Sequence, residues 1–203
     1  MSSPNIIAIL PAAGTGTRVG DARPKQYLDL GGRPMIAHAI NVLSRIPRIS
    51  RIVVVLSPLD TLWSTLMAGE TRVETLAVGG VTRGESVRNA LRALSATCLP
   101  DDWMLVHDAA RCLVRPEWVD RLIDAFEPDR GHLVTVPVAE GRRGNPVLWS
   151  RRFFNELMTL DGDTGARHLI AKHAEAVAEV AVEGESAFLD IDTPQGLEAA
   201  RRG

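Results

Sequence analysis

The residue types best suited to chemistry gather in one glycine-containing segment, PAAGTGTRVGDARPKQY at residues 11–27, directly after the apolar run at residues 6–10. A short run of branched or long apolar residues bounded by Pro and Gly predicts a buried parallel strand. Gly14 and Gly16 then remove the side chains that would keep backbone N–H groups away from a polyphosphate. The segment predicts a phosphate-binding loop, although the two glycines alone would also suit a plain strand-to-helix turn.

Three cations favour the phosphate-binding interpretation. Arg18, Arg23 and Lys25 lie within eight residues of one another. The planar guanidinium groups of Arg and the compact ammonium group of Lys can together hold several phosphate oxygens and neutralise the charge that develops during a phosphoryl-type transfer. Two better-known glycine signatures do not fit. A Walker A loop needs Ser or Thr after its Lys, where this chain has Gln26, and the dinucleotide-binding pattern needs Gly where Val19 stands.

Carboxylates follow two strand-like segments. Asp108 comes just after the apolar run at residues 103–106, and open α/β sheets bind ligands at the carboxyl ends of their strands. Mg²⁺ needs only one or two carboxylates together with substrate phosphates and water, so Asp108 is the first candidate ligand. Asp190 and Asp192, on one side of the segment AFLDID, are candidate second ligands. The alternative roles are a turn cap for Asp108 and a helix cap for the later pair.

A second glycine-containing segment, GGVTRGESVRNAL at residues 79–91, suits a reader of the base and ribose. Gly79 and Gly80 would let the backbone approach a pyrimidine edge. Arg83 supplies a further cation, and Ser86 could cap a helix or contact the ribose. The alternative is an ordinary loop entering a helix, and we assign Glu85 to such a capping role.

His107 precedes Asp108 and invites an acid–base role. A lone His at a strand end is more often packed and hydrogen-bonded, and transfer to a phosphate needs no general base because that acceptor is already ionised. The chain has no GxSxG motif, so covalent catalysis has no support. Direct in-line attack remains.

Composition narrows the class of protein. The chain has 203 residues, which suits one domain with a sizeable core. Its 23 basic and 25 acidic residues give a net charge of −2 without a polybasic strip, which argues against nucleic-acid binding. The first apolar stretch is too short to span a bilayer, and Cys98 and Cys112 lack metal-ligand spacing and suit reduced thiols. We therefore expect a cytoplasmic protein with no nucleic-acid or membrane partner.

Short β-like runs alternate with helical patterns along the chain, which predicts an α/β fold with a Rossmann-like, mixed and mostly parallel sheet and helices on both faces. The helical patterns include the apolar stripes Ile36–Ile40–Leu43 and Val87–Leu91–Leu94. The predicted strands are residues 6–10, 51–57, 73–78, 103–106 and 133–138. A final helix is expected from Thr193.

Three motifs resemble a known family. AAGTGTRVG followed by PKQY, GGVTRGESVRNAL and VHDAARCLV resemble, in order and spacing, the signatures of 2-C-methyl-D-erythritol 4-phosphate cytidylyltransferases, within the sugar-nucleotide-type nucleotidyltransferases. The resemblance implies a GT-A-like nucleotidyltransferase fold, CTP and a small phosphorylated acceptor as substrates, and Mg²⁺ as cofactor.

The resemblance also implies roles for individual residues. Arg18 and Lys25 would hold the α-phosphate and the leaving pyrophosphate, residues 14–17 would cradle the β- and γ-phosphates, and Asp108 would hold Mg²⁺. The full predicted nucleotide site is Pro11, Ala12, Ala13, Gly14, Thr15, Gly16, Thr17, Arg18, Lys25, Gly79, Gly80, Arg83 and Ser86.

The later part departs from this family's pattern. Such enzymes normally follow the fifth strand with a projecting β arm used for dimerisation and acceptor binding, whereas VPVAE at residues 136–140 passes straight into GRRGNPVLW. The motifs GNPVLW, GD-x-GAR and DIDTP resemble molybdenum cofactor cytidylyltransferases instead. The chain is therefore interpreted as one domain, with a CTP-binding part at 1–132 and an acceptor-side part at 133–203, and as a natural or engineered hybrid.

Acceptor contacts are expected from the later part, with Asn145 and Arg167 as candidates, while its Arg pairs also suit a solvated face. The sequence thus predicts a Mg²⁺-dependent cytidylyltransferase, monomeric or weakly dimeric, with methylerythritol phosphate as the first acceptor and molybdenum cofactor as the alternative. A nucleotide-binding module or a folded scaffold without turnover is the alternative class.

Overall fold

The computed structural model describes residues 5–14, 23–159 and 166–183. The strands are β1 (Ile6–Pro11), β2 (Asp29–Leu30), β3 (Arg33–Pro34), β4 (Ile49–Val55), β5 (Glu74–Leu76), β6 (Trp103–Val106), β7 (Val134–Ala139), β8 (Arg142–Arg143), β9 (Val147–Ser150) and β10 (Val177–Ala181). The α-helices are α1 (Met35–Leu43), α2 (Trp63–Leu66), α3 (Arg83–Leu94), α4 (Pro116–Asp124), α5 (Phe154–Leu157) and α6 (Arg167–Lys172). Within these residues, 3₁₀ turns join the helices and strands at η2 (Lys25–Tyr27), η3 (Pro128–Arg130), η4 (Arg151–Phe153) and η5 (Ala174–Ala176).

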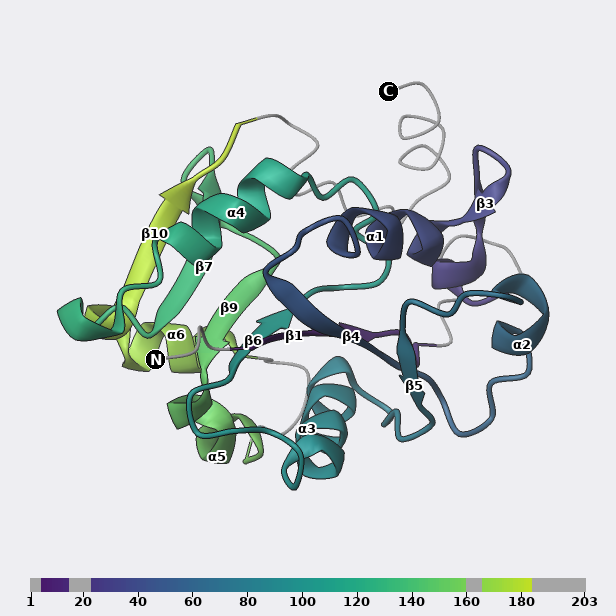
Figure 1. Cartoon of the computed structure of the whole chain (residues 1–203), viewed down its shortest axis with the longest axis horizontal. Coiled ribbons are helices and arrows are strands. Elements are labelled where there is room, and N and C mark those ends of the chain that lie inside the picture. The colour runs from purple at the N-terminus through teal and green to yellow at the C-terminus, as the bar shows by residue number, and fades with distance from the viewer. Residues whose placement is uncertain (1–4, 15–22, 160–165, 184–203) are drawn as a thin grey trace.

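A mixed sheet with the strand order β10-β7-β9-β6-β1-β4-β5 forms the middle layer (Figure 1), and β8 pairs with β7. β1 pairs in parallel with both β4 and β6, while β9 runs antiparallel to β6 and β7. Because the chain adds strands first on one side of β1 and then on the other, the order reverses at β1. Open α/β sheets bind ligands at such a reversal, beyond the carboxyl ends of the strands.

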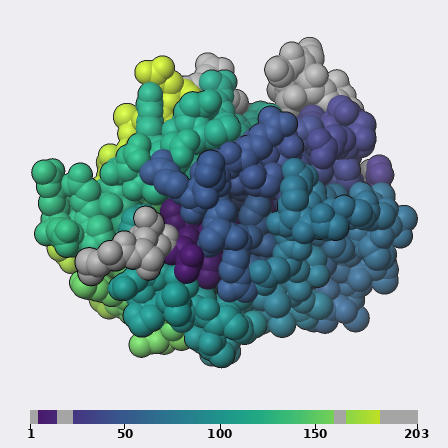
Figure 2. All heavy atoms as spheres, viewed as in Figure 1, coloured from purple at the N-terminus to yellow at the C-terminus, as the bar shows by residue number. Residues whose placement is uncertain are grey.

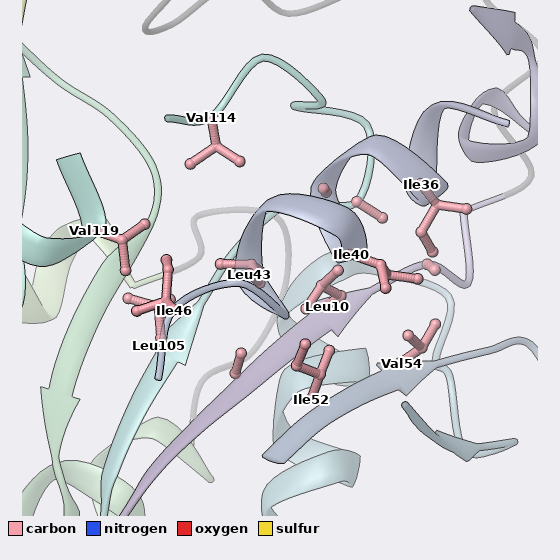
Figure 3. Close-up of a cluster of buried hydrophobic side chains, with 14 of the residues drawn as sticks. Leu10, Ile36, Ile40, Leu43, Ile46, Ile52, Val54, Leu105, Val114 and Val119 are labelled. Carbon is pink, nitrogen blue, oxygen red and sulfur yellow. The ribbon is translucent and has the colours of Figure 1, made fainter. Parts of the chain in front are cut away.

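One face of the sheet is covered by α1 and α4. Figure 3 shows Ile36, Ile40 and Leu43 of α1 reaching toward Leu10 of β1 and Ile52 of β4. All of these side chains are at most 4 % exposed. The helical spacing in α1 thus forms the stripe that the sequence predicts, because positions three and four apart share one face of a helix.

The opposite face is covered by α3 and α5. Val87 and Leu91 of α3 pack in one cluster with Ile7 and Ile9 of β1, the residues that alternate with those facing α1. β1 is therefore buried on both faces, and its purple atoms show only as a small area between later segments in the space-filling view (Figure 2). The predicted α/β class, with helices on both faces of a mostly parallel sheet, is confirmed.

The predicted strands are present, with shifted ends. Residues 51–57 form a strand that spans Ile49–Val55, and residues 73–78 shorten to Glu74–Leu76. The sequence analysis missed β9, where NPVLW forms an antiparallel strand, and β10, the edge strand beside β7. The helix expected from Thr193 lies outside the described residues.

A two-residue turn joins β7 to β8 where the resemblance leads one to expect a long arm. Glu140 and Gly141 both have positive φ, 51° and 71°, as a tight antiparallel hairpin of the primed type requires. The reading of this junction as a direct passage is confirmed.

None of the helices within the described residues has the length and apolar character needed to cross a membrane.

Candidate functional site

The first part of the site lies at the carboxyl end of β1, where two buried side chains fix the turn that carries Lys25. The amide of Gln26 donates to the carbonyl of Ala12 at 2.6 Å. The hydroxyl of Tyr27 donates to Asp60 at 2.7 Å, and burial, followed by the Asp60 carboxylate, raises the pKa of Tyr27. The half-buried Lys25 is therefore held against the loop that leaves β1.

The second part is the loop at residues 79–82, which enters α3. Thr82 is the N-cap, and it forms a capping box with Glu85. The Glu85 carboxylate accepts from the amides of Val81 at 2.7 Å and Thr82 at 3.2 Å, so the structural role given to Glu85 is confirmed. Ser86 is not the cap. Its hydroxyl donates to the Thr82 carbonyl at 3.0 Å and accepts from the Gly80 amide at 3.1 Å.

The two glycines of this loop meet a packing requirement. A Cβ at Gly79 would lie 2.7 Å from the carbonyl oxygen of Leu56, and one at Gly80 would lie 2.8 Å from the Glu85 carboxylate. The Gly79 amide donates to that same Leu56 carbonyl at 2.8 Å. Close approach to neighbouring protein atoms is thus sufficient to require glycine here.

The third part is Asp108, just beyond β6. Its carboxylate has partners from three segments: it pairs with Arg83 of α3, accepts from the side-chain amide of Asn145 at 3.0 Å, and pairs with Arg111 at 3.3 Å. Arg83 also donates to the side-chain oxygen of Asn145 at 3.3 Å. Burial alone would raise the pKa of Asp108, but the charge and hydrogen bond of Arg83, helped by His107 and Arg111, lower it overall. The carboxylate is therefore ionised at neutral pH.

His107 is buried, with 1 % of its surface exposed. Its Nε2 atom lies 3.0 Å from the carbonyl of Arg111, and burial lowers its pKa to about 4. The interpretation of His107 as a packed, hydrogen-bonded residue is confirmed. A neutral imidazole inside the core is not placed to exchange protons with a ligand.

These parts line one open cavity of about 230 Å³. The lining residues are Pro11, Ala12, Ala13, Gly14, Lys25, Gln26, Gly80, Val81, Thr82, Arg83, Ser86, Asp108, Ala109 and Ala110. Segments that lie far apart along the chain thus meet at the carboxyl ends of β1 and β6. Of the predicted nucleotide site, Pro11 to Gly14, Lys25, Gly80, Arg83 and Ser86 meet there.

The remaining predicted residues divide into two groups. Among the described residues, three predicted ones do not line the cavity: Gly79, Asn145 and Arg167. Asn145 is connected to the cavity by its hydrogen bond to Asp108, and Arg167 is exposed at the start of α6. Thr15, Gly16, Thr17, Arg18, Asp190 and Asp192 lie outside the described residues. The sequence analysis did not identify six further residues of the site: Gln26, Val81, Thr82, Ala109, Ala110 and Arg111. For Arg111 a signal was available, because two residues between it and Asp108 suit a turn that brings the two side chains together.

Asp108 is the ionised carboxylate in the cavity lining, and within residues 5–14, 23–159 and 166–183 no three His, Cys, Asp or Glu side chains gather as a metal site. Among the described residues, a cation bound in this cavity would therefore find one ionised carboxylate in the lining, that of Asp108. Mg²⁺ binds in that manner, with few protein carboxylates and several phosphate or water oxygens.

Comparison with known proteins identifies relatives. The family model described as 2-C-methyl-D-erythritol 4-phosphate cytidylyltransferase matches residues 6–144. An enzyme of that name from Laribacter hongkongensis is 50 % identical over 137 residues, which cover 66 % of this chain and 58 % of the relative. The match thus spans less than two thirds of that relative's length. One from Chromobacterium violaceum is 40 % identical over 218 residues, which cover 97 % of this chain and 96 % of the relative.

Solved structures agree over nearly the whole chain. A crystal structure of 4-diphosphocytidyl-2C-methyl-D-erythritol synthase matches with a TM-score of 0.77 and 26 % identity, covering 100 % of this chain and 99 % of the other. Rv0371c from Mycobacterium tuberculosis H37Rv matches with a TM-score of 0.80 and 25 % identity, covering 98 % of this chain and 99 % of the other.

Proposed function

Because the chain belongs to the 2-C-methyl-D-erythritol 4-phosphate cytidylyltransferase family, we propose that it transfers the cytidylyl group of CTP to 2-C-methyl-D-erythritol 4-phosphate and releases pyrophosphate. The observation that carries this proposal is the single cavity in which the loop after β1, Lys25, the entrance to α3 and Asp108 meet. A phosphate-binding loop, a base-contacting loop and an anionic metal ligand are the three parts that such a transfer requires.

In the proposed reaction an oxygen of the acceptor phosphate attacks the α-phosphorus of CTP. A bond forms between that oxygen and the α-phosphorus, the bond from the α-phosphorus to the bridging oxygen breaks, and pyrophosphate leaves with the electron pair. Lys25, fixed by its neighbours Gln26 and Tyr27, would neutralise charge on the α-phosphate as it develops. Arg18 would act beside it, and residues 14–17 would cradle the outer phosphates.

The loop at residues 79–82 supports a preference for cytosine. The amides of all four residues are used inside the protein, so this loop presents a base with acceptors rather than donors. No hydrogen bond among the described residues occupies the carbonyls of Gly80 and Val81. The exocyclic amino group of cytosine donates hydrogen bonds, whereas uracil has a carbonyl at the same position.

Asp108 would hold Mg²⁺ together with the phosphates of CTP, and Asp190 or Asp192 could add a second carboxylate. The bound ion would supply charge neutralisation of the triphosphate. Both oxygens of Asp108 have partners within the protein. Each carboxylate oxygen has two lone pairs, so the ion could bind the oxygen that pairs with Arg83 without displacing it.

The acceptor end would be built within one chain, by Asn145 and Arg111 beside Asp108, because only a two-residue turn follows β7. Arg167 stays a more distant candidate. Molybdenum cofactor is the competing acceptor, because the motifs that resemble molybdenum cofactor cytidylyltransferases follow this short turn. The hybrid hypothesis gains no support from the Chromobacterium violaceum relative, which aligns with the later part as well. Monomeric or weakly dimeric assembly and a cytoplasmic location stay predictions.

The test incubates the protein and Mg²⁺ with CTP plus either methylerythritol phosphate or molybdenum cofactor, and measures pyrophosphate. Release with methylerythritol phosphate supports the proposal, and release only with molybdenum cofactor reverses the choice of acceptor. Binding of CTP without release from either would favour the nucleotide-binding module. UTP in place of CTP is the matched control for the base.

A further inference from the structure

His107 lies in the core directly before Asp108. Its backbone amide donates to the carbonyl of Ile9 at 2.9 Å, which fixes the end of β6 against β1. The side chain is 1 % exposed, and it does not line the cavity formed by the described residues. Any influence on the reaction must therefore pass through a neighbour.

The hydrogen bond of the ring defines its tautomer. A backbone carbonyl can only accept, so Nε2 must carry the proton that bonds to Arg111 at 3.0 Å. Nδ1 is then an unprotonated acceptor, and it is buried with no partner among the described residues. An unpaired buried acceptor costs stability, so the ring contributes here through Nε2 alone.

That bond closes a short turn. The turn begins at Asp108, and the Arg111 amide donates back to the Asp108 carbonyl at 2.9 Å. The Arg111 guanidinium also pairs with the Asp108 carboxylate at 3.3 Å. His107 thus holds the far end of the turn from inside the core while the carboxylate at its near end lines the cavity.

We propose that His107 is a positioning residue: its Nε2–H bond to the Arg111 carbonyl holds the turn at residues 108–111, and so aims the Asp108 carboxylate into the cavity with Arg111 beside it. This inference rests on the proposed function for its effect on turnover. The positioning itself is a property of the fold and needs no substrate.

Two substitutions separate positioning from packing. His107→Phe keeps an aromatic ring, a somewhat larger one, but has no donor. His107→Gln carries an amide N–H that reaches the place of Nε2, so it keeps the bond to Arg111. With CTP, Mg²⁺ and the acceptor, we expect His107→Phe to lower kcat by about 10-fold or more, because small displacements of catalytic groups have large effects on rate. We expect His107→Gln to restore kcat to within about 3-fold of the wild type, with KM for CTP changed less than kcat in both variants.

A second measurement needs no turnover. Hydrogen exchange of the Arg111 amide reports whether the turn stays closed, and we expect faster exchange in His107→Phe but wild-type exchange in His107→Gln. Equal exchange and equal kcat in the two variants would overturn the inference. If the wild type releases no pyrophosphate with either acceptor, the proposed function fails, and exchange alone then decides the positioning role.

Discussion

Acidification should destabilise the protein through the buried ring of His107. Its folded-state pKa is about 4, against an ordinary value of 6.5, so the unfolded chain binds more protons between these values. The resulting stability is fully present above pH 6.5 and is lost as the pH falls toward 4. Between pH 7.5 and pH 4.5 this single group should lower the free energy of unfolding by about 2 to 3 kcal/mol, a large share of the total for a domain.

Urea denaturation at the two pH values measures this loss, and His107→Gln is the control because glutamine does not titrate. Carboxylates whose lowered pKa values have other causes, such as Glu70 and Glu74, destabilise both proteins alike on acidification, so they cancel in the comparison. Asp108 does not cancel fully, because His107 contributes to its lowered pKa. The wild type should lose about 2 to 3 kcal/mol more than His107→Gln. If the two proteins lose the same free energy within about 0.5 kcal/mol, the ring is not buried in neutral form.

Three further outcomes are expected. CTP with Mg²⁺ should raise the melting temperature more than ATP, GTP or UTP with Mg²⁺, because only a ligand that fits the folded state stabilises it by mass action; equal shifts with every nucleotide would remove the base-contacting role of the loop at residues 79–82. Lys25→Ala and Asp108→Asn should each lower the rate of pyrophosphate release by about 10²-fold or more, and near-wild-type release by the Asp108 variant would count against a metal ligand there. Thr82→Ala should lower the free energy of unfolding by about 1 kcal/mol through loss of the N-cap, with Thr82→Ser restoring it in the same urea titration.

The fold can be predicted from the sequence wherever apolar residues form a continuous run or a regular stripe. Residues 6–10 read as a buried strand because all five are apolar, and they are at most 2 % exposed. In contrast, β9 was missed because its four residues follow a Gly-Asn-Pro run that resembles a loop, and their pairing with β6 is set by tertiary contacts. β10 has no apolar alternation strong enough to identify an edge strand.

Residues of the candidate site could be predicted where the sequence shows glycines or charged side chains after a strand. They could not be predicted where a residue's role depends on contacts with distant parts of the chain. The glycines and Lys25 identified the loop after β1, and Asp108 was found from its place after a strand. Gln26 gave no such signal, because its role depends on the carbonyl of Ala12, which lies 14 residues away. The partnership of Arg83 with Asp108 joins residues 25 positions apart, a contact that spacing alone does not reveal.

The Asp108 carboxylate joins parts of the chain that lie far apart in the sequence. Arg83 belongs to α3, whose entrance is the proposed base-contacting loop, and Asn145 lies between β8 and β9. Because both side chains bond to Asp108 and to each other, the two sides of the site share one anion. A change in the partners of that anion must alter Arg83 and Asn145 together, since ionised hydrogen-bond partners are strongly held and costly to leave unpaired. The predicted division into a CTP-binding part at 1–132 and an acceptor-side part at 133–203 therefore does not separate the residues of the site, because Arg83 and Asn145 hold the same carboxylate.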